Sequence, residues 1–119
     1  MESHPVQPKR PPTRFGPADF QGIDLNRPGK WAVAFLADWC PFCRRFVPDF
    51  SALDSNGFGL AWADISADDN PLWDRFDIEV IPTVIVFRDR KAIFRADGRY
   101  GIGLLPDDLA AITAAGSAE

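Results

Sequence analysis

The first half of the chain contains two clear hydrophobic patterns. Residues 31–37 are all apolar, and continuous rather than alternating apolarity is typical of a strand buried on both faces, as in a parallel sheet. Residues 42–53 place apolar side chains at helical spacing, with charged residues on the opposite face. Pro41 suits the first turn of that helix, where its missing N–H costs nothing. The pattern therefore predicts a buried strand followed directly by an amphipathic helix.

The remainder of the chain predicts a further alternation of strands and helices. The expected elements are a strand at 60–65, a short helix at 70–76, strands 78–87 and 91–95 joined by a turn at Asp89 and Arg90, and a helix from Pro106. Alternation that ends in a hairpin predicts an α/β fold. We expect a mixed, mostly parallel central sheet flanked by helices, with a C-terminal antiparallel hairpin plus helix.

The N-terminal segment differs in composition from the rest of the chain. Residues 1–19 are rich in proline and basic residues and almost lack aliphatic ones. Such a segment buries too little apolar area to offset the entropy lost on ordering. We therefore expect a flexible arm over residues 1–19 and a single domain over residues 20–119, which is an ordinary domain length.

Composition and charge weigh against several functional classes. The formal net charge is −4, and no basic stripe with interleaved aromatic residues favours nucleic acid. The longest apolar run is far shorter than the ~20 residues of a membrane span. The N-terminus lacks the apolar stretch of a secretory signal, which predicts a cytoplasmic protein. We expect a monomer that binds neither nucleic acid nor membrane.

Cys40 and Cys43 carry the candidate chemistry. They stand three residues apart where the predicted strand meets the predicted helix, so both sulfurs lie on one face of the helix start, close enough to bond. Free N–H groups and the positive end of the helix dipole stabilise a thiolate there. We expect Cys40, at the cap, to be the attacking thiolate and Cys43 to be the resolving thiol.

Half of a zinc site is the main alternative for this spacing. Zinc usually takes four protein ligands, and the chain offers no further cysteine and a single histidine, His4, in the N-terminal arm. A metal or iron–sulfur site would need a dimer or a second protein, and the colour and metal content of purified protein would test it. Two idle core cysteines are a further alternative, although packing alone does not require the flanking Trp39 and Pro41. We expect no metal.

Several separated segments resemble the thioredoxin family. Segment 37–44, ADWCPFCR, is similar to the family's active-site segment, in which an aromatic residue precedes the first cysteine, and Pro48 stands where its helix carries a kinking proline. Segment 81–83, IPT, is similar to the family's cis-proline loop, and Gly98 matches a glycine after the last strand. The resemblance covers about residues 29–112 and implies a thioredoxin-like fold.

The resemblance also implies roles for particular residues. A cis bond between Ile81 and Pro82 would face this loop toward the cysteines, and the Ile81 backbone would pair with an extended substrate by strand-like addition. A trans proline at the start of an edge strand is the alternative. The implied substrate-binding residues are Trp39, Pro41, Phe42, Ile81, Pro82 and Gly98. We expect Trp39 and Phe42 to be exposed beside the cysteines, and no cofactor beyond the two sulfurs.

Three departures from the family pattern affect these expectations. Pro41 and Phe42 between the cysteines resemble the glutaredoxin pair rather than the usual Gly-Pro, which leaves the reduction potential open. Ala34 aligns with the family's buried acid, so we hypothesise that water or Asp38 assists proton transfer. Near the last hairpin lies a basic cluster of Arg88, Arg90, Lys91, Arg95 and Arg99. We interpret it as a solvated face, with a docking patch for an acidic partner as the alternative.

These expectations converge on a thiol–disulfide oxidoreductase acting on protein substrates, most simply as a disulfide reductant that an upstream thioredoxin reductase-type enzyme regenerates. A glutaredoxin-like, glutathione-linked reductase is the nearest alternative. A thioredoxin-fold binding module with idle cysteines is the alternative from a different class, and a Cys40→Ser variant without phenotype would favour it.

Overall fold

Five strands form the central sheet of the computed structural model, which describes residues 12–53 and 57–117. Across the sheet they are β1 (Thr13–Phe15), β5 (Gly59–Asp64), β4 (Lys30–Leu36), β6 (Thr83–Arg88) and β7 (Lys91–Ala96). Strands β1, β5 and β4 are parallel neighbours, whereas β6 is antiparallel to both β4 and β7. Four strands therefore run one way and β6 runs against them. The expected mixed, mostly parallel sheet with a C-terminal hairpin is confirmed.

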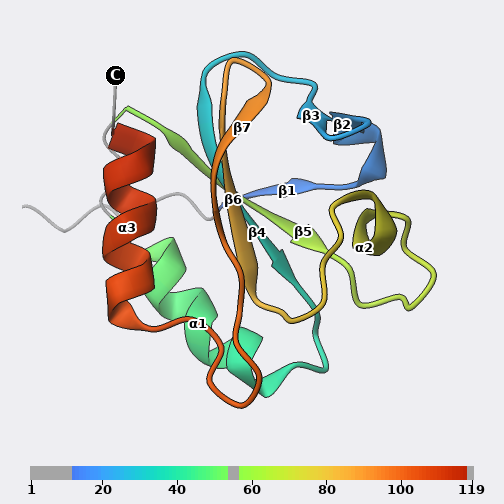
Figure 1. Cartoon of the computed structure of the whole chain (residues 1–119), viewed down its shortest axis with the longest axis vertical. Coiled ribbons are helices and arrows are strands. Elements are labelled where there is room, and N and C mark those ends of the chain that lie inside the picture. The colour runs from blue at the N-terminus through green and yellow to red at the C-terminus, as the bar shows by residue number, and fades with distance from the viewer. Residues whose placement is uncertain (1–11, 54–56, 118–119) are drawn as a thin grey trace, which may run out of the picture.

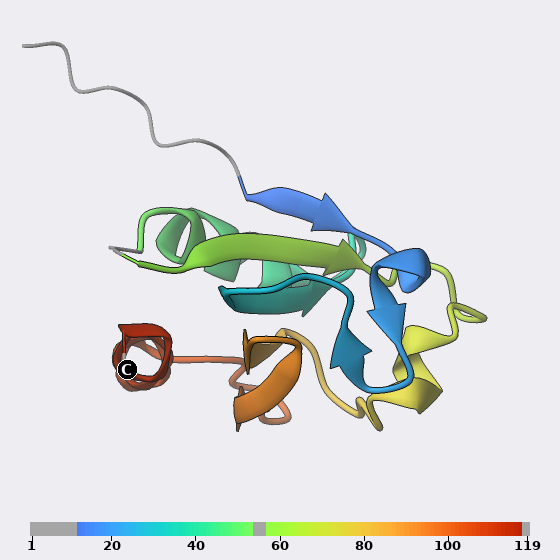
Figure 2. The same cartoon turned by 90° about the horizontal axis from the view of Figure 1, so that it is seen from above.

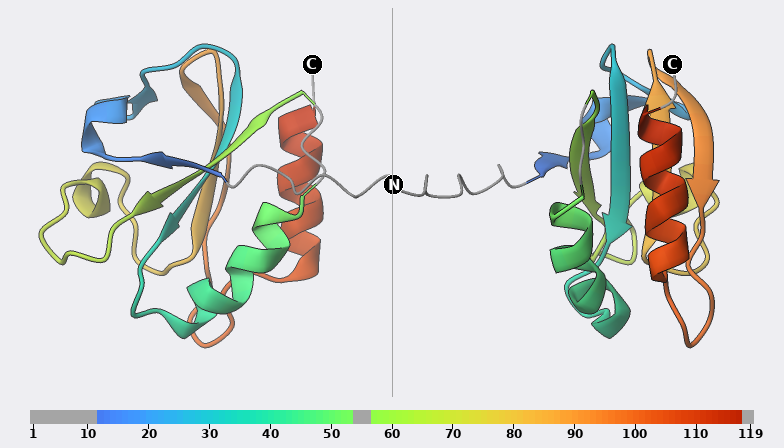
Figure 3. Two further views of the ribbon diagram at one scale, coloured as in Figure 1. Left: turned by 180° about the vertical axis from the view of Figure 1, so that it is seen from behind. Right: turned by 90° about the vertical axis from the view of Figure 1, so that its left-hand side faces the viewer.

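Helices cover both faces of this sheet (Figure 1). Helices α1 (Pro41–Ser51) and α3 (Pro106–Ser117) lie on one face, and the right-hand view of Figure 3 looks directly at them. The short helix α2 (Leu72–Arg75) lies on the other face together with a two-stranded hairpin, β2 (Phe20–Gln21) and β3 (Asp24–Leu25), which follows a 3-10 turn, η1 (Pro17–Asp19).

Alternation along β4 explains how the two faces differ. Side chains two residues apart share a face of a strand, so Trp31, Val33 and Phe35 point one way and Ala32 and Ala34 the other. The Phe35 ring stacks on Phe20, with centroids 6.0 Å apart, and packs at a tilt against Phe76, with centroids 5.2 Å apart. The α1 side thus meets small alanines, whereas the hairpin side buries an aromatic cluster. Each such ring pair adds about 0.5–1.5 kcal/mol beyond area burial.

The N-terminal segment corrects one expectation. Residues 1–11 lie outside the described residues, but residues 12–19, which we expected to belong to the arm, are folded. Strand β1 lies beside β5 at the edge of the sheet, as Figure 2 shows from above. Their register places Thr13 opposite Ala61. Phe15 is buried, and its ring contacts Phe20 and Trp31 at 6.2 and 5.2 Å. The burial of Phe15 and the hydrogen bonds between β1 and β5 offset the entropy that residues 12–19 lose on ordering.

The segment after α2 differs from the predicted strand at 78–87. The strand begins only at Thr83, and residues 77–82 form a loop that carries a cis peptide bond between Ile81 and Pro82. The predicted turn at Asp89 and Arg90 is confirmed, and both residues adopt positive φ, at 48° and 81°. A carboxylate oxygen of Asp89 accepts a hydrogen bond from the Gly29 N–H at 3.0 Å, which supports this turn without a glycine in it.

Candidate redox site

The two cysteines lie at the junction of β4 and α1. Cys40 is the N-cap of α1, and its Sγ accepts a hydrogen bond from the Cys43 N–H at 3.1 Å. Pro41 occupies the first helical position, as the pattern predicts. Both cysteines are free thiols and both are buried. The first sulfur therefore faces a backbone donor that stabilises negative charge on it, and the second lies behind it.

Cys43 is the more deeply buried thiol of the pair, with 1% of its surface exposed. Burial raises the pKa of the Cys43 thiol far above its ordinary value, and its hydrogen bond with Cys40 raises it further. At neutral pH Cys43 is thus a protonated thiol. It needs a route for its proton before it can act as a nucleophile.

The cis-proline loop faces Cys40 from the opposite side. The Cys40 thiol lies 3.7 Å from the Ile81 carbonyl oxygen, which accepts its hydrogen bond. Gly98 is buried against this loop, and a Cβ at that position would lie 2.5 Å from the Pro82 carbonyl oxygen. The structure therefore brings the Ile81 carbonyl, in the peptide that precedes Pro82, to the dithiol. Gly98 stands behind this loop as the residue whose missing side chain allows the close approach.

Trp39 is exposed beside Cys40, as expected, and is held in place by two contacts. Its indole Nε1 donates to the Ser66 carbonyl at 2.9 Å, and its ring stacks on Trp73 with centroids 6.4 Å apart. The Ser66 hydroxyl accepts the Asp38 N–H at 2.8 Å and donates to the Asp64 carboxylate. Sequence reasoning missed Ser66. The signal that could have found it is the Asp-x-Ser spacing at the end of a strand, which is typical of a turn closed by a hydrogen bond from the backbone to the Asp side chain.

Phe42 corrects another expectation, because it is half-buried rather than exposed. A Cβ on Gly103 would lie 3.1 Å from the Phe42 Cβ, so the loop after β7 covers this ring. The Arg45 guanidinium lies 5.2 Å from the ring centroid and donates to the Ile102 carbonyl. Tyr100, 79% exposed, and Ile102 are exposed apolar side chains of this loop.

A cavity of about 230 Å³ opens beside Cys43. It is lined by Arg14, Leu36, Ala37, Asp38, Cys43, Arg44, Val47, Trp62 and Asp64. Trp62 Nε1 is buried and has no hydrogen-bond partner among the described residues, which fits an ordered water in a cavity of this size. The cavity therefore connects the buried thiol to two carboxylates and two guanidinium groups.

The described residues contain no group of three or more His, Cys, Asp or Glu side chains that could hold a metal ion. His4, the one histidine, lies outside them. Within the same residues no helix is long and apolar enough to cross a membrane.

Comparison with known sequences supports one family. The Thioredoxin family model matches residues 15–109. Chicken protein disulfide-isomerase A3 is 32% identical over 84 residues, which are 68% of this chain and 16% of that protein. Thioredoxin from Chlamydia caviae is 28% identical over 67 residues, 56% of this chain and 66% of that protein. The chain thus spans at most about two thirds of the length of these relatives.

Comparison with solved structures supports the same fold. Thioredoxin from Malassezia sympodialis superposes with a TM-score of 0.72 at 17% identity, covering 98% of this chain and all of that one. Spinach chloroplast thioredoxin f superposes with a TM-score of 0.70 at 16% identity, covering 89% of this chain and 86% of that one. From the family match, the sheet order and the dithiol at the start of α1, the chain belongs to the thioredoxin family.

Proposed function

We propose that this protein is a thiol–disulfide oxidoreductase that exchanges its Cys40–Cys43 pair with disulfides of protein substrates, in the direction of reduction. One observation carries the proposal. Cys40 caps a helix; its sulfur accepts the Cys43 N–H, and its thiol donates to the Ile81 carbonyl. A nucleophilic sulfur, a second thiol three residues away and a backbone carbonyl that becomes available to a substrate strand when Cys40 loses its proton meet at one point.

The reaction proceeds in two exchange steps. The Cys40 thiolate attacks one sulfur of the substrate disulfide, which forms a mixed disulfide and expels the other substrate sulfur as a thiolate. Cys43 then loses its proton and attacks the Cys40 sulfur, which releases the second substrate thiolate and leaves a Cys40–Cys43 disulfide. Two electrons pass to the substrate, so neither a metal nor an organic cofactor takes part.

The proton of Cys43 leaves through the cavity beside it. Burial holds this thiol protonated, Ala34 stands where the family has its buried acid, and Asp38 and Asp64 line the cavity. We expect water in this cavity, with Asp38 as the acceptor, to carry the proton away. The release of substrate should therefore accelerate as the pH rises, because a larger fraction of Cys43 is then deprotonated.

Substrates bind in extended form across the dithiol. A strand of the substrate pairs with the Ile81 backbone, and Trp39 and Pro41 offer exposed apolar surface on one side of Cys40. Phe42, Pro82 and Gly98 complete the proposed substrate-binding residues, and Gly98 lies against the Pro82 carbonyl. A thioredoxin reductase-type enzyme would restore the dithiol to a monomeric protein working in the cytoplasm.

The reduction potential of the Cys40–Cys43 pair tests the direction of electron flow. Equilibration in glutathione buffers, followed by thiol trapping, should give about −270 mV for a reductant of the thioredoxin type. A value near about −180 mV would instead favour the isomerase direction, as in the relatives named protein disulfide-isomerase. A Cys40→Ser variant that still reduces insulin would overturn the proposal altogether.

Pro41 and Phe42 between the cysteines favour one second candidate, a glutathione-linked reductase. A glutaredoxin-type enzyme removes glutathione from a mixed disulfide by using its first cysteine alone. The matched variant is Cys43→Ser, which keeps that activity in a glutaredoxin-type enzyme and loses turnover in a dithiol reductant. Retained deglutathionylation by this variant would favour the glutaredoxin alternative.

A further inference from the structure

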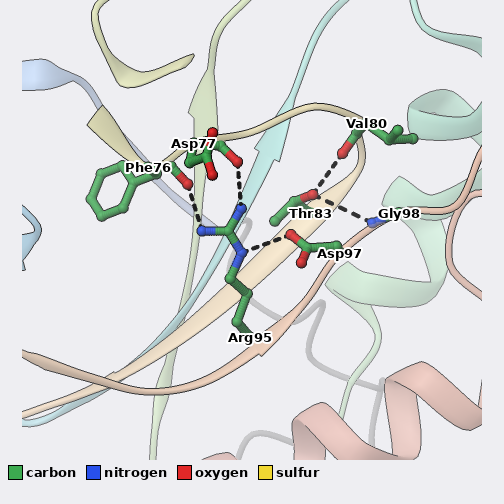
Figure 4. Close-up of polar contacts among 7 residues, drawn as sticks. All are labelled: Phe76, Asp77, Val80, Thr83, Arg95, Asp97 and Gly98. Carbon is green, nitrogen blue, oxygen red and sulfur yellow. Dashed lines mark hydrogen bonds and ion pairs between the residues drawn. The ribbon is translucent and has the colours of Figure 1, made fainter. Parts of the chain in front are cut away.

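The loop before β6 is fastened at its beginning by one side chain from β7. The Arg95 guanidinium donates to the Phe76 carbonyl and, at 3.0 Å, to the Asp77 carbonyl, while its Nε pairs with the Asp97 carboxylate at 2.7 Å (Figure 4). Asp77 has a φ of 51°, a left-handed conformation that non-glycine residues seldom adopt. All three nitrogens of the guanidinium are thus engaged: two with the carbonyls where the chain leaves α2, and Nε with Asp97, just after β7.

The same loop is fastened at its end by Thr83. This side chain is fully buried, and its hydroxyl donates to the Val80 carbonyl at 2.6 Å and accepts the Gly98 N–H at 3.4 Å. Figure 4 shows that Thr83 thereby links Val80, within the loop, to Gly98, in the segment after β7. Between the two fixed points lie Ile81 and Pro82, the residues that face Cys40.

The guanidinium of Arg95 suits these three contacts better than the ammonium group of a lysine would. A planar guanidinium places its N–H groups in a rigid fork, so one side chain holds two successive carbonyls and a carboxylate in fixed directions. The Arg95 side chain is 33% exposed, so its contacts are partly shielded from water. Its neighbours in the basic cluster differ, because Lys91, for example, makes one ion pair with Asp24 and is 71% exposed.

We infer that Arg95 is a positioning residue for substrate binding: with Asp97, it holds the start of the 77–82 loop so that the Ile81 backbone presents its pairing edge to a substrate strand beside Cys40. The inference rests on the proposed function, in which a substrate strand pairs with Ile81. Arg95 itself does not touch the reacting sulfurs. Its loss affects the fit of extended substrates and leaves the reactivity of the dithiol unchanged.

The test compares two substrates in the full-length protein. The first is a disulfide-linked dimer of an unstructured peptide, long enough to pair with Ile81, and the second is dithiobis(nitrobenzoate), which is too small to do so. For Arg95→Ala, kcat/KM for the peptide should fall about tenfold, which corresponds to about 1.4 kcal/mol, through a higher KM. The rate with the small disulfide should stay within about twofold of the unmodified protein.

Two further variants keep the test decisive if Arg95→Ala unfolds. Arg95→Lys retains the charge but has one donor group in place of the fork, so it should restore only part of the peptide affinity. Lys91→Ala, on the same strand, is the matched control and should change neither substrate. An unchanged peptide KM in Arg95→Lys and Arg95→Ala, or an equal loss with both substrates, would overturn the inference.

Hydrogen exchange separates this inference from the proposed function. Amides of residues 78–81 should exchange faster in Arg95→Lys than in the unmodified protein, whether or not either protein reduces disulfides. If exchange is faster in Arg95→Lys but the unmodified protein does not reduce disulfides, the proposed function alone is refuted. Unchanged exchange together with an unchanged peptide KM would refute the positioning role alone.

Discussion

Replacing Gly98 by alanine should damage both stability and substrate binding. A Cβ there would lie 2.5 Å from the Pro82 carbonyl oxygen, and also 3.3 Å from the Ile81 carbonyl carbon and a Val80 methyl. Side-chain Cβ atoms essentially never approach another heavy atom within 3.0 Å. The loop must therefore retreat by at least half an ångström, the difference between 2.5 and 3.0 Å. It cannot rotate out of the way, because the nearest atom belongs to the backbone.

Overpacking of this kind costs about 1–3 kcal/mol of unfolding free energy. In a domain of this size the melting temperature should fall by about 4 °C for each kcal/mol. Because the Ile81 carbonyl moves away from Cys40 with the loop, KM for a disulfide peptide should also rise. Urea unfolding of the reduced protein and steady-state peptide kinetics measure the two effects.

Gly16→Ala is the matched control for this substitution. Gly16 has a φ of −130° and open space where its Cβ would stand, so alanine fits there without strain. Its effect on stability should stay within about 0.5 kcal/mol. If Gly98→Ala and Gly16→Ala unfold at the same urea concentration and share one peptide KM, the close approach at Pro82 does not constrain the loop.

Three further predictions concern other parts of the molecule. Because the pKa of Cys43 is raised in the folded protein, the unfolded chain loses this proton at a lower pH than the folded one does. The unfolding free energy of the reduced protein should therefore fall by up to about 1.4 kcal/mol per pH unit above about pH 9. Cys43→Ala should remove this part of the slope in urea titrations, and an unaltered slope would contradict it. Phe15→Ala should cost about 3–5 kcal/mol in urea unfolding, because the ring is buried; a negligible loss would show that β1 contributes little. Ser66→Ala removes the hydroxyl that holds Asp38 and should cost about 1 kcal/mol. It should also loosen Trp39, which lower fluorescence anisotropy would reveal.

The parts of the fold that the sequence predicted are those with dense local signals. The apolar run of β4 and the helical spacing of α1 each repeat a pattern over many residues, so tertiary context did not change their outcome. The cysteine pair was predictable for the same reason, since its chemistry depends on spacing at one helix start. Strand β1 escaped prediction because three residues in a proline-rich segment present no period, and its pairing with β5 is a long-range contact.

Side-chain roles were harder to predict where chemistry alone does not distinguish them. In the sequence, nothing distinguishes Arg95 from the other basic residues of the cluster. A charged side chain in a hairpin is ordinarily exposed to solvent. Only the path of the chain brings the Phe76 and Asp77 carbonyls within its reach. Phe42 was misjudged in the same way, because the loop that covers it is distant in sequence. Ser66 was missed because a serine after a strand is common.

The burial of both thiols has a consequence for which partners can react. Cys40 exposes 4% of its surface and Cys43 exposes 1%, so a bulky or rigid disulfide cannot bring its sulfurs to them. A chain that is locally unfolded can thread a narrow segment to the dithiol, whereas the same disulfide inside a compact domain stays out of reach. If the protein has the proposed activity, it selects disulfides by the flexibility of the surrounding chain, and it reduces first those whose surroundings have already opened.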